Sequence, residues 1–193
     1  HGGGVITALL RYAVDQEMID SAVISEIELE APPELKAVSL IPDDVLVTVN
    51  GKLSPGAVAS AFGKAVREYG KTKIAFVGTP CRVLALRKLE SWEHKITDNL
   101  RIIIGLMCLW SFSLPRLIEY TARKFDLDPS EIEKITLDND LNIHVKDNVI
   151  TLPVSEAKAQ ALLGCRACVD FTAELADISV GGASPLEDWS TVI

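Results

Sequence analysis

The chain has 193 residues, of which 48% are hydrophobic and 24% are charged. These proportions are enough for one folded domain with a sizeable core, and they exclude a disordered chain. The formal net charge is −8, and the 19 Lys and Arg residues are scattered along the sequence. Because nucleic acids and anionic membranes are bound by clustered cations, this charge pattern argues against both as partners.

The sequence contains no predicted membrane span and no signal peptide. Its longest apolar run, residues 102–110, contains Gly105 and is shorter than the roughly 18 residues that cross a bilayer. The chain begins His-Gly-Gly-Gly, without the charged and apolar regions of a signal peptide, so we expect a soluble, cytoplasmic protein. The glycine-rich start and the end at Ile193, within a predicted strand, indicate a fragment truncated at both ends.

Predicted helices and strands alternate over the first two thirds of the chain. Apolar periodicity, β-rich runs and turn residues predict a helix over residues 5–18, strands over 21–29 and 43–49, a helix over 55–69, a strand over 73–77, a helix over 82–89, a strand over 100–106 and a helix over 115–125. Pro55 lies at the first helical position after Ser54, and Gly70 follows the same helix. The alternation predicts an α/β fold with a mixed, largely parallel sheet and flanking helices.

The pattern changes after residue 130. Short β-rich segments joined by Asp and Asn turns predict a small antiparallel β region near 132–153, with strands over 132–137, 142–146 and 148–153. A short helix over 155–162 follows, and we expect it to end at Gly164, just before two cysteines. The antiparallel region is therefore predicted to be an addition to the α/β core.

The four cysteines are the most informative residues of the sequence. Cys81 follows a predicted strand, Cys108 ends another, and Cys165 and Cys168 form a Cys-x-x-Cys pair. Four thiolates of this kind in a cytoplasmic protein fit a tetrahedral cage for an iron–sulfur cluster or for zinc. Two other interpretations stay open, since a single buried cysteine packs as a small hydrophobic residue and a single Cys-x-x-Cys can act as a redox dithiol.

The positions of the first two cysteines favour a cluster over zinc. Structural zinc is usually held by two close pairs in a small knuckle. Here Cys81 and Cys108 are expected at the ends of adjacent strands, where a sizeable core would bury the metal. Burial suits a redox centre, because exposure and hydrogen bonds to sulfur set its potential. A zinc-binding structural or interaction module remains the alternative.

Short glycine motifs indicate possible phosphate contacts. Residues 2–4 are glycines before a predicted helix, where backbone N–H groups and the helix dipole can hold a phosphate, and Thr7 adds a hydroxyl one turn later. Asn50-Gly51-Lys52 offers a turn followed by a cation, which is equally typical of a solvated hairpin. No Ser/His/Asp arrangement supports nucleophilic catalysis, and no catalytic residue is predicted.

Several motifs together resemble the coenzyme F420 hydrogenase/dehydrogenase beta-subunit family. They occur in order over nearly the whole chain and are Gly-Gly-Val-Ile-Thr-Ala-Leu-Leu at 3–10, Phe-Val-Gly-Thr-Pro-Cys at 76–81, Ile-Gly-Leu-Met-Cys at 104–108, Cys-Arg-Ala-Cys-Val-Asp at 165–170, Ala-Glu-Leu-Ala-Asp-Ile-Ser-Val-Gly at 173–181 and Trp-Ser-Thr-Val at 189–192. The sequence departs from the family at His1 and Gly2, where a Ser usually precedes the glycines, and at Leu53, where the family often has Tyr.

The resemblance implies an iron–sulfur flavoprotein, an oxidoreductase subunit for electron transfer. It predicts a single domain over 1–193 that binds FAD and one [4Fe-4S] cluster, exchanges a hydride with coenzyme F420, and passes electrons to the catalytic and electron-transfer subunits of a hydrogenase or dehydrogenase complex. The metal-binding residues carried over are Cys81, Cys108, Cys165 and Cys168. The flavin-binding residues carried over are Gly3, Gly4, Thr7, Asn50, Lys52, Gly78 and Thr79.

Two further points concern the hydride donor. Lys52 and Arg82 adjoin motif turns, and we expect them to line a basic pocket for the charged tail of F420. A relative with the same cofactors and another donor, such as ferredoxin, fits the same residues and stays an alternative.

Overall fold

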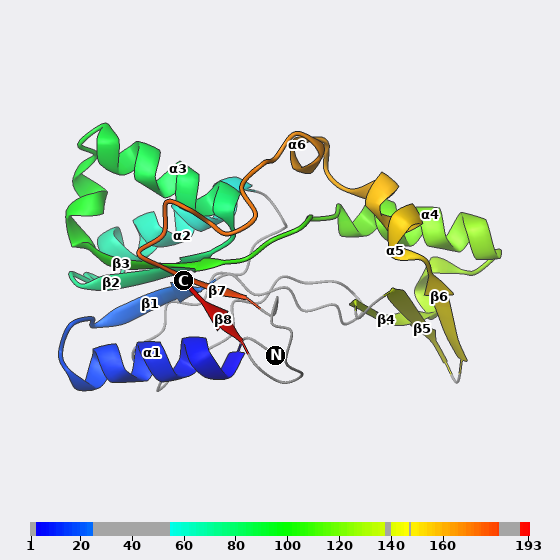
Figure 1. Cartoon of the computed structure of the whole chain (residues 1–193), viewed down its shortest axis with the longest axis horizontal. Helices are drawn as coiled ribbons and strands as arrows, with labels where there is room; N and C mark the ends of the chain where they lie inside the picture. Colours follow the sequence, from blue (N-terminus) through cyan, green and yellow to red (C-terminus); the bar gives the residue numbers. More distant parts are fainter. Residues whose placement is uncertain (1–2, 25–54, 138–139, 147, 182–189) are drawn as a thin grey trace. The chain divides into compact units, whose positions relative to one another are not determined.

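The computed structural model describes residues 3–24, 55–137, 140–146, 148–181 and 190–193. The chain divides into two compact units (Figure 1). Of the described residues, unit 1 comprises 3–24, 55–108, 169–181 and 190–193, and unit 2 comprises 109–137, 140–146 and 148–168. The predicted strand over 43–49, Asn50 and Lys52 lie outside the described residues.

Unit 1 is built on a sheet with the strand order β1-β2-β3-β7-β8. The strands are β1 (Ser21–Ile24), β2 (Ile74–Gly78), β3 (Leu100–Leu106), β7 (Ile178–Gly181) and β8 (Thr191–Val192). The first four are parallel and β8 is antiparallel to β7. The prediction of a mixed, largely parallel sheet is confirmed.

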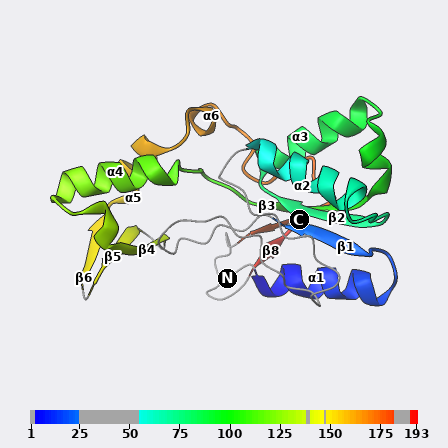
Figure 2. The same cartoon turned by 180° about the vertical axis from the view of Figure 1, so that it is seen from behind.

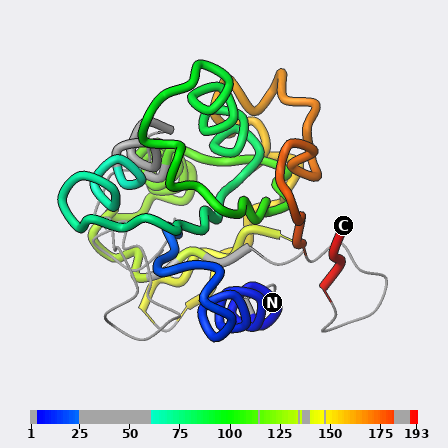
Figure 3. Tube along the Cα trace, turned by 90° about the vertical axis from the view of Figure 1, so that its left-hand side faces the viewer, coloured from blue at the N-terminus to red at the C-terminus, as the bar shows by residue number. Residues whose placement is uncertain are grey.

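Helices cover both faces of this sheet. The helix α1 (Gly3–Asp15) lies on one face, and α2 (Pro55–Arg67) and α3 (Pro80–Ser91) lie on the other, as Figures 1 and 2 show from opposite sides and Figure 3 shows nearly along α1. A one-turn helix, η1 (Lys95–Asn99), precedes β3. All residues of β1 and β2 are buried, as expected for strands covered on both faces, and this explains their continuous apolar sequences.

Each face of the sheet has its own core. Ile6, Leu10 and Ala13 of α1 pack against one face, and the α2 and α3 residues Phe62 and Leu86 belong to the core on the other face. The helix starts follow from proline, which occupies the first helical position of both α2 and α3. The helix α2 ends at Arg67, two residues earlier than predicted, and Gly70 then adopts a φ of +61°.

Unit 2 contains the predicted small antiparallel sheet. Its elements are α4 (Leu114–Phe125), η2 (Pro129–Glu131), β4 (Ile132–Leu137), β5 (Leu141–Val145), β6 (Asn148–Leu152), α5 (Val154–Ala157), η3 (Lys158–Gln160) and α6 (Leu163–Arg166). The sheet order is β4-β5-β6, with both pairs antiparallel, which confirms the prediction for residues 132–153.

The predicted helix over 155–162 is wrong in its extent. The helix α5 ends at Ala157, η3 follows, and Ala161 forms an antiparallel bridge with Phe112. Gly164 then lies inside α6 together with Cys165, and does not end a helix. The tertiary pairing with Phe112 overrides the helical pattern of the local sequence. In the described part of the chain, no helix has the length and apolar character required to cross a membrane.

Candidate metal and cofactor site

The first cysteine pair lies just beyond the carboxyl ends of two adjacent parallel strands. Gly78 at the end of β2 pairs with Gly105 of β3, and each glycine is followed three positions later by a cysteine, Cys81 and Cys108 respectively. This confirms that the two cysteines come from neighbouring strands. Ligands of open α/β sheets bind at this edge, because the loops there bring together residues that are distant in sequence.

Cys81 lies in the first turn of α3. The preceding Thr79 is the N-cap residue, and its Oγ1 lies 3.4 Å from Cys81 Sγ. The helix therefore begins at Pro80, two residues before the predicted start at Arg82. Because the N-terminal end of a helix dipole is positive, this position favours a negatively charged sulfur ligand.

Arg82 is half-buried next to Cys81. Its N–H donates to Thr79 O at 2.9 Å, which closes the first turn of the helix. Burial lowers the pKa of Arg82 from its usual value, while the charges of Cys81 and Cys108 act in the opposite direction. Arginine stays protonated at neutral pH even when its pKa is lowered, so the first turn of α3 carries a permanent positive charge.

Residues 169–177, called the strap below, cross β3 at Gly105. The N–H of Cys108 donates to Phe171 O at 3.0 Å, and the N–H of Asp177 donates to Ile103 O at 2.9 Å. A Cβ at Gly105 would lie 2.4 Å from the Cβ of Ala173, which is fully buried and has a φ of +58°. The close approach of the strap therefore requires a glycine at position 105.

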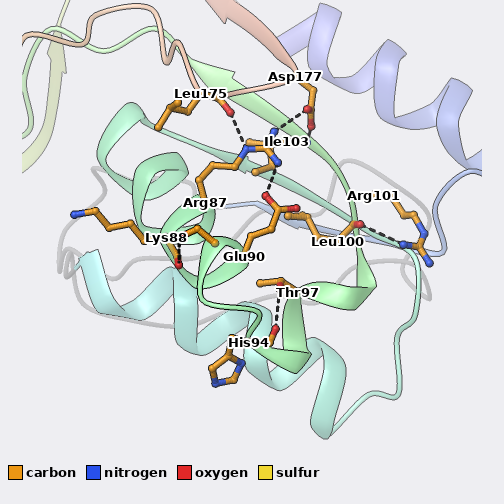
Figure 4. A network of polar contacts seen from close by, with 11 residues as sticks. Arg87, Lys88, Glu90, His94, Thr97, Leu100, Arg101, Ile103, Leu175 and Asp177 are labelled. Atoms are coloured by element: carbon orange, nitrogen blue, oxygen red, sulfur yellow. Dashed lines mark hydrogen bonds and ion pairs between the residues drawn. The ribbon is translucent and has the colours of Figure 1, made fainter.

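The strap is fastened to α3 by Arg87, in the network drawn in Figure 4. Arg87 Nε donates to Leu175 O at 2.8 Å, and its other nitrogens bind Asp177 Oδ1 at 2.7 Å and Glu90 Oε2 at 2.8 Å. The second oxygen of Asp177 accepts from the N–H of Ile103 at 2.7 Å. Asp177 thus links the strap to both the cysteine-bearing helix and strand β3.

The second cysteine pair belongs to unit 2. Cys165 lies in α6, and its Sγ accepts a hydrogen bond from the N–H of Ser111 at 3.3 Å. Ser111 O in turn accepts from the N–H of Leu162 at 2.9 Å, which fixes this segment beside α6. The N–H of Cys168 donates to Cys165 O at 3.4 Å, so the pair forms a tight turn.

The iron–sulfur site and its four-cysteine ligand set stay a prediction. None of the four cysteines forms a disulfide. The amide at Cys165 and the cation near the other pair are groups that stabilise cluster thiolates. Among the described residues, no three His, Cys, Asp or Glu side chains gather to hold a metal. The expected burial is also incomplete, because Cys81 and Cys168 are exposed.

The predicted flavin residues lie in three parts of the chain, which are the first turns of α1, the connection from β2 to α3, and positions 50–52. Gly3 and Gly4 open α1, whose N-terminus lies on the side of the sheet where β1 and β3 end (Figure 1). Among the described residues, no atom would lie within 4 Å of a Cβ at Gly4, so packing in this part of the chain does not explain the glycine. A Cβ at Gly78 would lie 2.8 Å from the Phe76 ring, so packing does explain that one. Thr7 lies in α1 and is half-buried, Thr79 caps α3, and the predicted contacts Asn50 and Lys52 lie outside the described residues.

Comparison with known proteins identifies the family. The family model that describes the C terminus of the coenzyme F420 hydrogenase/dehydrogenase beta subunit matches residues 71–193. The chain belongs to this family. That span includes all four cysteines, the strap and the Arg87 network.

Relatives of the family match the chain over almost its full length. The coenzyme F420 hydrogenase subunit beta of Methanothermobacter thermautotrophicus is 30% identical over 99% of this chain and 69% of its own length. A coenzyme F420-dependent sulfite reductase of Methanocaldococcus jannaschii is 30% identical over 99% of this chain and 32% of its own length. A chain of the F420-reducing [NiFe] hydrogenase complex from Methanosarcina barkeri superimposes with a TM-score of 0.75 at 25% identity, over 98% of this chain and 67% of that one.

Sequence reasoning missed the contacts that support the cysteines. Asp177 lies in a motif that resembles the family, yet its partner Arg87 is 90 positions away and no local pattern pairs them. The amide of Ser111 was equally undetectable, because a backbone donor has no residue signature. Gly105 carried one usable signal: a glycine inside an apolar strand indicates close approach of another backbone.

Proposed function

We propose that this chain is the flavin- and cluster-binding subunit of an F420-linked oxidoreductase, which passes electrons between coenzyme F420 and a partner subunit. When bound, FAD exchanges a hydride and a [4Fe-4S] cluster exchanges single electrons. The proposed cluster ligands are Cys81, Cys108, Cys165 and Cys168. The family membership supports the F420 link, since the relatives carry that coenzyme in their names.

The observation that carries the proposal is the placement of Cys81 and Cys108. The two cysteines follow paired glycines at the carboxyl edge of the parallel sheet, Cys81 in the first turn of α3 and Cys108 just after β3, and the buried strands β2 and β3 hold both in place. An isolated structural cysteine has no need for such a position, whereas a metal bound there would have two thiolates supplied from a rigid frame.

Short chain connections join the first pair to the second. Ser111, whose N–H donates to Cys165 Sγ, follows Cys108 by three residues. Phe171, whose carbonyl accepts from the N–H of Cys108, follows Cys168 by three residues. The use of all four thiols by one metal centre is part of the proposal.

The N-terminus of α1 supports the proposed flavin contact. The N–H groups at the start of a helix have no partners within the helix and can bind the diphosphate of FAD. The open space at Gly4 leaves room for such a group against the backbone.

The metal assignment is tested on the full-length protein purified without oxygen. We expect a brown protein with about four iron atoms and one FAD per chain, measured by visible absorbance, metal analysis and flavin release. Cys108→Ser should lose iron while it keeps its fold by circular dichroism. A colourless protein that contains one zinc ion would contradict the cluster. A full iron complement in Cys108→Ser would show that Cys108 is not a ligand.

The flavin contact is tested separately by Gly4→Val. The variant should lose most of its FAD and retain its iron, because no atom of the described residues lies within 4 Å of a Cβ at Gly4. Ala8→Val is the matched control, since Ala8 is an exposed residue of the same helix. Equal loss of FAD in both variants would mean that valine disturbs the helix and that Gly4 has no special role.

The hydride donor is tested by reduction in the absence of oxygen. Reduced F420 should bleach the flavin absorbance, and the cluster absorbance should decrease afterwards. If the flavin stays oxidised with reduced F420 but is reduced by NADH or reduced ferredoxin, the F420 assignment fails and the cofactor assignment is retained.

A further inference from the structure

Cys165 and Cys168 are joined by a backbone hydrogen bond. The N–H of Cys168 donates to Cys165 O at 3.4 Å, and the N–H of Ala167 donates to Gly164 O at 3.3 Å. Residues 165–168 therefore form a turn, in which the first and fourth Cα atoms lie less than about 7 Å apart. A disulfide spans Cα separations of roughly 4.4–6.8 Å. The local fold thus brings the two cysteines within reach of a disulfide bond.

The two sulfurs of this pair differ in access. Cys168 is exposed, whereas Cys165 is half-buried and its Sγ accepts the N–H of Ser111 at 3.3 Å. A dissolved molecule therefore reaches Cys168 more easily than Cys165. An accessible cysteine beside a second, resolving cysteine is the arrangement found in redox-sensing sites. The structure thus favours a first reaction at Cys168 and a second one at Cys165.

We propose that Cys165 and Cys168 form a reversible disulfide when they hold no metal, with a small dissolved disulfide such as oxidised glutathione as the oxidant. Cys168 Sγ attacks one sulfur of this molecule, forms a mixed disulfide and releases the other half as a thiol. Cys165 Sγ then attacks Cys168 Sγ and releases the second half. The two small thiols carry the hydrogens of the two cysteines, so the small disulfide gains the two electrons that the pair loses.

The disulfide would act as a redox-sensitive switch on this pair. Cysteine binds metals as a thiolate, so two sulfurs that are bonded to each other are not available as ligands. The pair would accept a metal only after a dissolved thiol had reduced it. This inference goes beyond the proposed function, because it requires neither a particular metal nor the participation of Cys81 and Cys108.

The test uses the full-length protein, from which any bound metal is removed with a chelator in the presence of a thiol reductant and without oxygen. The reductant is removed, the protein is incubated with oxidised glutathione, and the remaining thiols are alkylated before digestion with trypsin. Trypsin cleaves after Arg166, which lies between the two cysteines. The disulfide should therefore appear in mass spectrometry as two peptides that stay joined until a reductant separates them. An excess of reduced glutathione should restore both thiols.

Two matched variants test the order of reaction. Cys165→Ser should stop at the mixed disulfide, with one glutathione on Cys168, because no second sulfur displaces it. In Cys168→Ser, glutathione should be added to Cys165 about tenfold more slowly, because Cys165 is less accessible. Liquid chromatography with mass spectrometry follows the addition with time, and circular dichroism checks that both variants keep their fold.

Four outcomes would overturn the inference. They are the absence of joined peptides in the metal-free wild type, a stronger pairing of Cys168 with Cys81 or Cys108, equal rates of glutathione addition in the two variants, and equally fast disulfide formation in protein that retains a metal. The last result would show that the metal does not use this pair. A wild-type protein isolated without any metal would refute the proposed function and would leave the disulfide to be measured in the same way.

Discussion

Cys81 and Cys108 follow strands β2 and β3, whose central residues are fully buried, whereas Cys165 and Cys168 lie in and just after α6, a four-residue helix without a buried residue. The first pair is therefore positioned by hydrophobic packing. The second pair is positioned by backbone hydrogen bonds such as the one from Ser111 to Cys165 Sγ. The fold therefore preorganises Cys81 and Cys108, whereas Cys165 and Cys168 would be ordered to a greater extent by binding of the proposed metal.

The largest expected effect comes from emptying the core below the first pair. Ile103 is fully buried in β3, and Ile103→Ala should lower the free energy of unfolding by about 2–5 kcal/mol, because it removes apolar contacts and leaves a cavity. Leu163→Ala is the control near the second pair. Leu163 is 75% exposed, so its loss should change stability by less than about 0.5 kcal/mol. Urea denaturation measures both, and similar losses would contradict the comparison.

A smaller effect is expected from filling the space at two glycines. Gly105→Ala would bring a methyl group within 2.4 Å of Ala173 Cβ and 2.8 Å of Ala176 Cβ, and should cost about 1–3 kcal/mol by displacing the strap. Gly164→Ala, beside Cys165, meets no atom within 4 Å and should be neutral or stabilising by up to about 1 kcal/mol. Thermal unfolding of the two variants distinguishes them. A stable Gly105→Ala protein would mean that the strap can move without cost.

A third, weaker effect concerns the attachment of the strap to α3. Asp177→Asn removes a charge that binds both Arg87 and the N–H of Ile103, and should cost about 0.5–1.5 kcal/mol. The amide of Cys108, which donates to the strap at Phe171 O, should then exchange its hydrogen faster.

The control for Asp177→Asn is Glu119→Gln on α4. The pair of Glu119 with Arg123 is mostly exposed, with side-chain exposures of 65% and 74%, and is worth at most about 0.5 kcal/mol. Glu119→Gln should leave hydrogen exchange at the Cys108 amide unchanged. Equal exchange at Cys108 in the two variants would show that the ion pair does not hold the strap.

The smallest expected effect is a pH dependence in unit 2. A hydrogen bond from Lys124, and to a lesser extent one from Tyr120, holds the pKa of Glu156 below its usual value. Desolvation of the carboxyl group acts in the opposite direction. A carboxyl group whose pKa is lowered in the folded state stabilises the protein above its unfolded pKa, and this contribution is lost as the pH falls through the folded value. Glu156→Gln should therefore have a slightly lower Tm than wild type at pH 7, with the difference vanishing below about pH 4. A difference that persists at low pH would show that packing, and not charge, causes it.

Much of the frame of this protein was predictable because it depends on local patterns. Strand β3 was predicted with the residues it has, since Leu100–Leu106 is a mostly apolar run that follows the polar residues 97–99. The start of α2 followed from proline, whereas α3 begins at Pro80, two residues before the predicted Arg82. The positions of Cys81 and Cys108 after adjacent strands followed from the alternation of elements. The helix predicted over 155–162 failed because the bridge between Ala161 and Phe112 joins residues about fifty positions apart.

The sequence by itself determined the helix–strand order, the antiparallel region and the positions of the four cysteines relative to them. Only the tertiary structure decided what surrounds those cysteines: the strap over Gly105, the link between Arg87 and Asp177, and the amide of Ser111 at Cys165. The physical reason is the separation along the sequence over which each kind of interaction acts. Turn residues and apolar periodicity act over a few positions, whereas these contacts join segments that meet only when the sheet and its helices have packed.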